Sequence, residues 1–230
     1  MNYCGQYKQD EYLDTVVFRK KTNGFFVDIG AHDGISLSNS YFFEKNRDWN
    51  GICVEPNPTV FRKLHDSRNC ITVNCAVSEE SGAVRFVKVS GAPEMLSGIK
   101  DNYDQRHVAR IQEETKANGG TVDEIDIHSE KLSSILDHYR VKKVDFCSID
   151  TEGSELAVLK SIDFSRVDIH CIVIEDNYNE EAIHPYLKNV GYACVGHVGG
   201  DKVYLKIKGI LKYLYYRFMT YFFNRFKLKD

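Results

Sequence analysis

The sequence predicts an α/β fold in which a mostly parallel sheet is covered by helices on both faces. Short apolar runs typical of strands alternate with helix-compatible segments through most of the 230 residues, a pattern that indicates parallel strands joined by helices. The first run, 25–29, leads through a glycine turn into a possible helix, which is the nucleotide-holding corner of such folds. Four runs end in an acidic residue, at the sheet edge where ligands bind.

The elements are expected in the following order. Strands are predicted at 25–29, 51–55, 71–76, 83–89, 144–149, 170–174, 192–198 and 203–207, and helices at 38–45, 58–66, 131–138, 154–162 and 180–190. Pro58 supports the start of its helix, because proline is favoured at the first helical position. Gly199 and Gly200 are expected to form the turn between the last two strands.

Residues 91–118 interrupt this alternation. The segment contains the sequence MLSGI and then a polar, helix-compatible run from 103 to 116. It would insert near the carboxyl ends of the strands, so we expect a lid or a substrate-binding insertion, with a plain surface excursion as the alternative. We expect residues 1–208 to form one domain that includes this insertion, and residues 209–230 to form a basic, aromatic helix.

The composition is that of an ordinary globular protein, with 43% hydrophobic and 27% charged residues. The N-terminus has no apolar signal region, and no stretch reaches about 18 uninterrupted apolar residues, so neither a secretory signal nor a membrane span is expected. The seven cysteines form no C-x-x-C pair, which indicates reduced thiols rather than a zinc site or a disulfide framework. We therefore expect a cytoplasmic protein.

The turn after the first strand has the pattern D-x-G-x-x-x-G, from Asp28 through Gly30 to Gly34. Glycines in such a turn let a ligand approach the backbone. A dinucleotide-binding turn would have a third glycine to wrap a pyrophosphate, which the Asp28 carboxylate would repel. That carboxylate suits a positively charged ligand, such as the amino group or sulfonium of S-adenosylmethionine. Glu55 ends the next strand, where an acidic residue can bind both hydroxyls of a ribose.

Three motifs resemble the FkbM family of S-adenosylmethionine-dependent methyltransferases. They are G-A-H-D-G at 30–34, W-x-G-I-x-x-E-P-N at 49–57 and S-I-D-x-E-G-x-E at 148–155, and the resemblance covers about residues 7–206. It implies a class I methyltransferase fold, which is Rossmann-like and has seven strands, the last of them antiparallel. It also implies transfer of a methyl group from S-adenosylmethionine to a hydroxyl, commonly of a sugar or a polyketide-like natural product.

The resemblance further implies which residues bind the cofactor. They are, for the methionine part, Asp28, Gly30, Ala31 and Gly34; for the ribose, Glu55 and Asn57; and for the adenine, Asn74 and Ala76. For the two asparagines, a role in turn formation is the alternative. Asp150 ends the fourth strand of the family pattern and would face both the methyl donor and the acceptor.

A sugar hydroxyl must lose its proton to accept a methyl group, and two mechanisms fit the sequence. In the first, a divalent cation such as Mg²⁺ binds Asp150, Glu175 and Asp176 and lowers the pKa of the hydroxyl. In the second, no metal binds, and Asp150, Glu152 or a histidine takes the proton. Glu152 could instead cap the following helix.

The histidine candidates are loop or insertion residues. His32 lies inside the glycine turn and is the nearest in sequence to the cofactor motif, and His107 and His184 are further possibilities. A single histidine in a loop is usually only solvated, so the carboxylates are preferred as the catalytic groups.

The expected acceptor is a hydroxyl of a sugar in a glycan or glycoconjugate. The alternatives are methylation of a small natural product or of nucleic acid, and an S-adenosylmethionine-binding protein without catalytic activity. Nucleic acid is not expected as a partner, because residues 1–201 carry a net charge of about −10. An NAD-dependent oxidoreductase is disfavoured by the missing third glycine.

The tail has the opposite charge. Residues 202–230 carry about +7, against a net charge of −3 for the whole chain. Apolar residues at helical spacing form a stripe there: Ile210, Leu211, Leu214, Phe218, Tyr221 and Phe222. One interpretation is a helix docked on the sheet or on a second copy of the chain. The other is a helix that lies on an anionic membrane surface.

Overall fold

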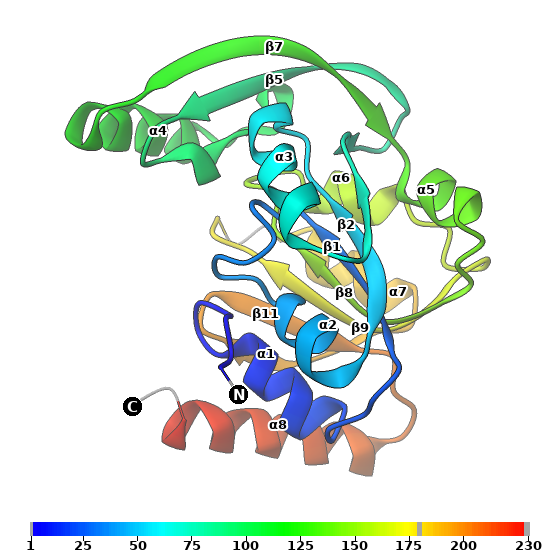
Figure 1. The fold of residues 1–230 in the computed structure, drawn as a ribbon. Helices are drawn as coiled ribbons and strands as arrows, with labels where there is room; N and C mark the ends of the chain where they lie inside the picture. The colour runs from blue at the N-terminus through cyan, green and yellow to red at the C-terminus, as the bar shows by residue number, and fades with distance from the viewer. Residues whose placement is uncertain (1, 179–180, 228–230) are drawn as a thin grey trace.

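The computed structural model describes residues 2–178 and 181–227, and two β-sheets form its frame (Figure 1). The larger sheet has seven strands, in the spatial order β10 (Ala193–Val198), β11 (Asp201–Leu205), β9 (Asp168–Glu175), β8 (Lys143–Ile149), β1 (Phe25–Ile29), β2 (Asn50–Val54) and β3 (Ile71–Val73). β11 runs antiparallel to β9 and β10, and the strand pairs from β9 across to β3 are parallel. This confirms the predicted seven-stranded, mostly parallel sheet of a class I methyltransferase, with its last strand antiparallel.

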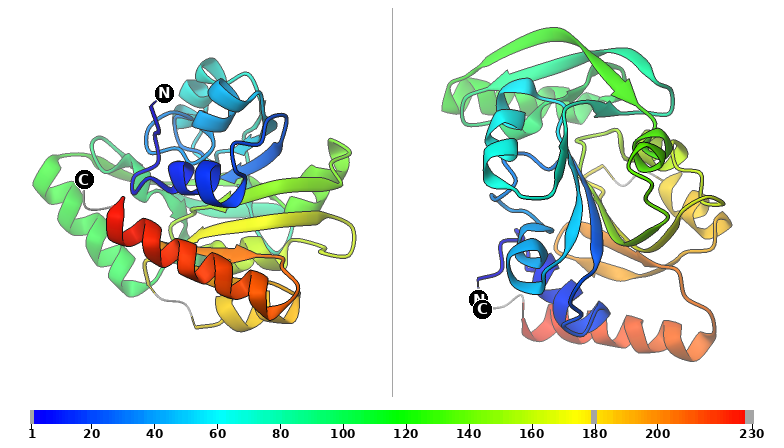
Figure 2. Two further views of the ribbon diagram at one scale, coloured as in Figure 1. Left: turned by 90° about the horizontal axis from the view of Figure 1, so that it is seen from below. Right: turned by 45° about the vertical axis from the view of Figure 1, so that its right-hand side comes forward.

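Helices cover both faces of this sheet, as predicted (Figure 2). Successive strand residues point to opposite faces, so Val27 and Cys147 belong to one core and Phe26 and Phe146 to the other. The first core is covered by α5 (Leu132–His138), α6 (Glu155–Lys160) and α7 (Ile183–Asn189). The second is covered by α1 (Gln9–Tyr12), the π-helical turn Leu13–Val17, α2 (Tyr41–Arg47), α3 (Pro58–Ser67) and α8 (Ile210–Phe226).

The smaller sheet lies beyond one end of the larger one. Its strands follow the order β4 (Ala76–Val77), β7 (Thr121–Glu130), β5 (Gly82–Ser90) and β6 (Gly98–Ile99). β5 and β7 pair antiparallel along the whole of β5 and arch over this end of the molecule in Figure 1. The segment 91–118 falls between them and contains β6, the 3₁₀ turns Glu94–Leu96 and Lys100–Asn102, and α4 (Gln105–Asn118). The sequence pattern did not predict β7.

The predicted strand at 71–76 is wrong in its second half. The chain leaves the larger sheet after Val73, and Ala76 pairs with β7 in the smaller one. Asn74 makes this bend, because its Nδ2 donates to the Glu55 carbonyl oxygen at 2.8 Å and so turns the chain across the end of β2. Adjacent residues of one apolar run therefore belong to two different sheets.

The ends of two predicted helices lie outside the described residues. The helix predicted at 180–190 is observed as α7 from Ile183, and Glu180 is not described. The predicted tail helix is observed as α8, and residues 228–230 are not described. No helix within the described ranges is long and apolar enough to cross a membrane.

Candidate active site

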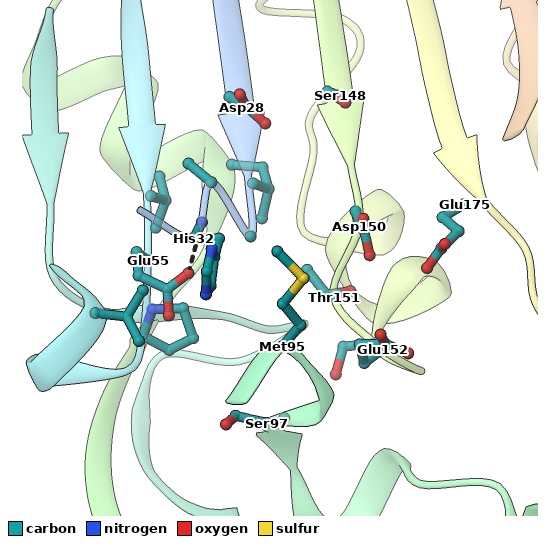
Figure 3. Close-up of a pocket in the computed structure, with 18 of the residues that line it drawn as sticks. Asp28, His32, Glu55, Met95, Ser97, Ser148, Asp150, Thr151, Glu152 and Glu175 are labelled. Atoms are coloured by element: carbon teal, nitrogen blue, oxygen red, sulfur yellow. Dashed lines mark hydrogen bonds between the residues drawn. The ribbon is translucent and has the colours of Figure 1, made fainter. Parts of the chain in front are cut away.

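A cleft opens at the carboxyl ends of β1, β2, β8 and β9 (Figure 3). The parallel register brings these ends together, since Ile29 lies opposite Val54 and Ile149, and Ile149 lies opposite Ile174. Residues of the small sheet and of α4 close the other side. The empty space of the cleft, part of it open to solvent, is about 1280 Å³.

The two glycines of this turn pack closely against other parts of the protein, in the direction in which a side chain would point. Gly30 and Gly34 both have φ of +81°, in the left-handed region that favours glycine. A Cβ on Gly30 would lie 1.7 Å from the Asp150 carbonyl oxygen, and a Cβ on Gly34 would lie 2.7 Å from Leu64 of α3. These glycines therefore make room for neighbouring protein and not for a ligand, which corrects the sequence-based reason. Gly30 and Ala31 line the cleft, whereas Gly34 does not.

Glu55 is held by two backbone turns. Its Oε2 accepts from the N–H of His32 at 3.0 Å, and its Oε1 accepts from the N–H of Asn57 at 2.8 Å. Burial raises the pKa of Glu55 to about 7, against the two backbone bonds, which lower it. A carboxylate has about four acceptor positions, so Glu55 keeps positions for two further donors such as ribose hydroxyls.

The two asparagines support the Glu55 turn from outside the cleft lining. Asn57 caps α3, where its Oδ1 accepts from the N–H of Thr59 at 3.1 Å. Asn74 bonds the Glu55 backbone, as described above. Their contacts favour the turn-forming alternative for both. Ala76 does line the cleft, together with four apolar residues that sequence reasoning did not identify: Cys75, Val77, Phe86 and Ile99.

Asp28 lies deeper in the cleft (Figure 3). Its Oδ2 accepts from Ser40 Oγ at 2.5 Å, and Ser40 Oγ in turn accepts from the Arg68 guanidinium at 3.0 Å. Burial raises the pKa of Asp28, against the bond from Ser40 and the charge of Arg68. Asp28 therefore ties β1 to α2 and to the end of α3, in addition to lining the cleft.

Asp150, Glu152 and Glu175 form the acidic end of the cleft. One carboxylate oxygen from each lies within 4.8 Å of the others, and Figure 3 shows the three side chains grouped at the ends of β8 and β9. Burial, and then the charges of Glu175 and Glu152, raise the pKa of Asp150. The protein surrounds Asp150, but its side chain still faces the solvent in the cleft. A ligand that displaces this water would raise the pKa of Asp150 further. Burial and the Glu175 charge likewise raise the pKa of Glu152 to about 8, against Arg110.

Asp176, the third predicted metal ligand, lies outside this group. Its Oδ2 accepts from Lys202 Nζ at 2.5 Å, and the geometry brings Glu152 to the position beside Asp150 and Glu175 instead. Within the described ranges, this is the one cluster of His, Cys, Asp or Glu side chains close enough to share a cation.

A polar network next to the acidic end was not identified from the sequence. Asp201 Oδ2 accepts from Gln9 Nε2 at 3.1 Å and from Asn39 Nδ2 at 3.4 Å, and Asn39 Nδ2 also donates to Ser148 Oγ at 3.1 Å. Burial, followed by the charge of Glu175, raises the pKa of Asp201 to about 7. Asn39 Oδ1 is buried and has no hydrogen-bond partner in the described part of the chain. All four side chains line the cleft, so Asn39 Oδ1 is available to a ligand donor.

His32 lies beside Glu55 and apart from the acidic end, with Met95 between them in Figure 3. Its ring nitrogens are 3.3 Å from Glu94 Oε1 and 3.7 Å from Asp33 Oδ1, and both are buried without a hydrogen bond among the described residues. His184 is exposed on α7 and is not part of the cleft lining. The geometry therefore separates the histidine candidates from the carboxylates, except for His107.

His107 fastens the insertion to the acidic end. Its Nε2 is 3.0 Å from the Leu96 carbonyl oxygen, which can only accept, so Nε2 carries the proton and donates. Burial lowers the pKa of His107, and the neutral ring then accepts at Nδ1 from the Tyr178 hydroxyl at 2.8 Å. Nδ1 is also 3.4 Å from Glu152 Oε2. The insertion thereby forms a wall of the cleft, which includes Glu94, Met95, Ser97, Gly98 and Arg110.

Comparisons with known proteins show which family the chain resembles. The model for the methyltransferase FkbM domain matches residues 28–194. Methyltransferase sdnD of Sordaria araneosa is 25% identical over 189 residues, which are 73% of this chain and 71% of the relative. Methyltransferase 1 of Beauveria bassiana (strain ARSEF 2860) is 24% identical, over 66% of this chain and 64% of the relative.

The chain was also compared with solved structures. The crystal structure of methyltransferase FkbM from Methylobacillus flagellatus KT superposes with a TM-score of 0.49 and 15% identity, over 83% of this chain and 47% of that chain. The present chain thus spans about half the length of this protein and about two thirds of the fungal relatives. The family match includes every predicted site residue but ends before α8.

Proposed function

The chain belongs to the FkbM methyltransferase family, and we propose that it is an O-methyltransferase whose acceptor is a hydroxyl of a sugar in a glycan or glycoconjugate. This proposal rests on one observation: the two ends of the cleft offer different chemical groups. Glu55 at one end offers fixed acceptors for a ribose, and the acidic end offers carboxylates of raised pKa for an acceptor hydroxyl.

The residues present fit S-adenosylmethionine. Polar atoms of His32, Asn39 and Glu152 line the cleft and are buried without hydrogen-bond partners among the described residues, and such atoms usually have partners when a site is filled. Glu55 would hold the ribose, and the apolar wall at Cys75–Val77 suits a flat base. When bound, the cofactor supplies a methyl group on a positively charged sulfur.

The network around Asn39 suits the amino-acid part of the cofactor. Asn39 Oδ1 can accept from an ammonium group, and Asp201 beside it can supply negative charge. Asp28 lies deeper in the same cleft and adds to this negative potential. A cationic ligand would favour the ionised form of Asp201, whose pKa is about 7 because of burial and the neighbouring Glu175.

Asp150 is the group we assign to remove the acceptor proton. It ends β8 at the point where the cleft meets the acidic end, and the neighbouring charges of Glu175 and Glu152 raise its pKa and hence its basicity. Glu152 and Glu175 would orient the hydroxyl by accepting hydrogen bonds. Arg110 of the insertion, whose Nη1 lies 3.8 Å from Glu152 Oε2, would hold Glu152 in place, and the insertion would keep bulk water from this end.

A second cavity supports a polyhydroxylated acceptor. It shares Glu152 and Glu175 with the main cleft and is lined mostly by polar and aromatic side chains: Asn102, Tyr103, Asp104, Arg106, Asp176, Asn177 and Tyr178. Amide and carboxylate groups next to tyrosine rings offer a sugar both hydrogen bonds and apolar contact. A small apolar natural product would match this polar lining poorly, and nucleic acid would meet like charge.

A divalent cation at the acidic end is the second mechanism, favoured by the 4.8 Å spacing of the three oxygens. Hard oxygen ligands suit Mg²⁺, which would lower the pKa of a chelated hydroxyl. The two mechanisms differ in one measurement. If the carboxylates act alone, activity survives EDTA, whereas loss of activity that Mg²⁺ restores would assign the proton transfer to a metal-bound hydroxyl.

The proposal is tested with S-adenosylmethionine carrying an isotopically labelled methyl group. The protein is incubated with glycans and glycoconjugates, and mass spectrometry of the products locates the label. We expect label on a sugar oxygen, and none with the Asp150→Asn variant. Label on nitrogen or carbon, or transfer to small apolar molecules only, would contradict the sugar O-methyltransferase assignment. Cofactor binding without transfer to any acceptor would favour a protein that has lost catalysis.

A further inference from the structure

α8 is attached to the domain by one of its faces. Its buried residues are Tyr216, Thr220 and Phe223. Thr220 Oγ1 and the Tyr12 hydroxyl lie 2.7 Å apart, and the Phe223 ring packs edge-on against Tyr12 with centroids 5.3 Å apart. Gly196 on β10 permits this close approach, since a Cβ there would lie 2.8 Å from Thr220. The helix is therefore seated on α1 and on β10.

The opposite face of α8 is apolar and exposed. Leu211 is 81% exposed, Phe218 is 62% exposed and Tyr221 is 60% exposed. The other exposed large side chains of this face are Ile210, Leu214, Tyr215, Phe222 and Phe226. The whole stripe predicted from the sequence lies on this face, and a different set of residues docks the helix. In Figure 2, no described segment lies over the outer side of α8.

Basic residues border this face. At 3.6 residues per turn, Arg217 falls at one edge of this face and Arg225 falls within it, whereas Lys212 falls on the docked side, next to Phe223. Arg217 and Arg225 are both exposed. Arg19 adds a further cation, with its guanidinium 5.4 Å from the Tyr215 ring centroid. Between Lys202 and Lys227 the sequence contains no Asp or Glu. The surface therefore combines aromatic and aliphatic groups with positive charge alone.

We propose that this face of α8 binds the anionic surface of a lipid bilayer. Its apolar side chains would enter the boundary between headgroups and acyl chains, and Arg217 and Arg225 would contact headgroup phosphates. Aromatic side chains are favoured at that depth, because their rings are amphipathic. The helix would lie in the plane of the surface, because its 17 residues do not form a membrane-crossing helix.

A second copy of the chain fits this face less well. A two-fold interface through α8 would bring the same face of two helices together. Each helix would present Arg217 and Arg225 to its equivalent, with no acidic residue on α8 to pair with them. Like charges desolvated in this way oppose association, whereas lipid phosphates neutralise them.

The test is co-sedimentation of the full chain with vesicles of pure phosphatidylcholine and of phosphatidylcholine mixed equally with phosphatidylglycerol. We expect binding to the mixed vesicles that weakens as salt rises, because the basic residues act through screened charge. One variant, Phe218→Ser with Phe222→Ser, removes apolar contact at constant charge. A second, Arg217→Glu with Arg225→Glu, reverses charge. Each should weaken binding by at least about tenfold.

A matched control reverses two exposed basic residues at the far end of the molecule, Arg62→Glu on α3 with Lys116→Glu on α4. It should bind vesicles like the wild type, and all three variants should keep the wild-type melting temperature and methyl transfer. Equal binding to neutral vesicles, or α8 variants that bind like the control, would overturn the proposal. So would a wild-type dimer that becomes monomeric in the Phe218→Ser/Phe222→Ser variant, because the face would then be a self-association surface.

Discussion

The two ends of the cleft hold their carboxylates in different ways. At one end, Glu55 accepts a backbone hydrogen bond at each oxygen, and the turns that donate them are part of the strand ends themselves. At the other end, one carboxylate oxygen from each of Asp150, Glu152 and Glu175 lies within 4.8 Å of the others. The Glu175 charge raises the pKa of both Asp150 and Glu152, and the Glu152 charge raises that of Asp150 further. The first end is built to bind, and the second keeps carboxylates ready to take up a proton or a cation.

The contrast has a physical basis. A carboxylate fixed by neutral N–H donors keeps its geometry and can recognise hydroxyl groups. Neighbouring carboxylates raise one another's proton affinity, which is what a general base needs when its substrate is a weakly acidic alcohol. Cofactor binding and proton transfer are thus assigned to two different ends of the same sheet edge.

The largest expected effect is at the acidic end. Asp150→Asn removes the proposed base, so methyl transfer should fall roughly 10²–10⁴-fold, the usual contribution of general base catalysis. The melting temperature should stay the same or rise, because a like-charge repulsion is removed. Initial rates with labelled cofactor and thermal unfolding measure the two quantities. Asp66→Asn, the same change at an exposed position of α3, should leave both unchanged. A folded Asp150→Asn enzyme with the wild-type rate would remove Asp150 from the mechanism.

The next effect is at the Glu55 end. Glu55→Ala removes the acceptor for both ribose hydroxyls, and cofactor affinity should weaken by about 2–4 kcal/mol, taking roughly 1.5–3 kcal/mol for each hydrogen bond to a charged group and some non-additivity. Isothermal titration calorimetry with S-adenosylmethionine gives this difference. Glu113→Ala, at an exposed position on α4, is the control and should bind normally. Unchanged affinity in Glu55→Ala would refute the ribose assignment.

The third expected effect is at Asn39, in the polar network next to the acidic end. Asn39→Ala removes the acceptor Oδ1 and the donor to Asp201 and Ser148, so cofactor affinity should fall by about 1–2 kcal/mol. Methyl transfer at saturating cofactor should change little. Calorimetry and rates measured on the same variant test this, and a loss of rate without a loss of affinity would move Asn39 to the acceptor side.

The smallest effect is a pH dependence of binding. The pKa of Glu55 is raised to about 7 in the ligand-free protein, and ribose hydroxyls bind its ionised form. Affinity should therefore rise with pH through about 7, by less than about tenfold per unit, with release of a proton. Titrations in buffers of different ionisation enthalpy detect that proton, and Glu55→Gln should abolish it.

The same pKa shift predicts a stability trend of the opposite direction. Because the folded-state pKa of Glu55 lies above its unfolded value, the folded protein holds the proton more tightly and loses stability as pH rises through about 7. Glu55→Gln should reduce this slope in thermal unfolding of the ligand-free protein. A wild-type melting temperature that rises over this range together with an unchanged slope in the variant would contradict the raised pKa.

Much of the larger sheet and its acidic strand ends could be predicted from the sequence. Asp28, Glu55, Asp150 and Glu175 each follow an apolar run, and parallel strands place such ends at one edge. The smaller sheet could not be predicted so directly, because β7 is mostly exposed and pairs with β5 across the intervening insertion. Its polar pattern carries little of the apolar signal that marks a buried strand.

The remaining site residues come from segments without such a signal. Asn39 lies in the loop before α2, Asp201 at the start of β11 and Met95 in a 3₁₀ turn, so only tertiary packing brings them to the cleft. Asn57 and Asn74 illustrate the reverse case. Asn57 is the last residue of the motif at 49–57, and Asn74 lies within the strand predicted at 71–76. Their side chains nevertheless bond to backbone and shape the turns that hold Glu55.

The central claim is that the Glu55 end binds the cofactor and the acidic end performs the transfer. It is tested most directly by calorimetric titration of S-adenosylmethionine into Glu55→Ala and Asp150→Asn, side by side with the wild-type protein. The claim predicts that Glu55→Ala loses about 2–4 kcal/mol of binding free energy, whereas Asp150→Asn binds the cofactor at least as well as the wild type. A loss in Asp150→Asn equal to that in Glu55→Ala would contradict it, because Asp150 would then be a cofactor-binding residue.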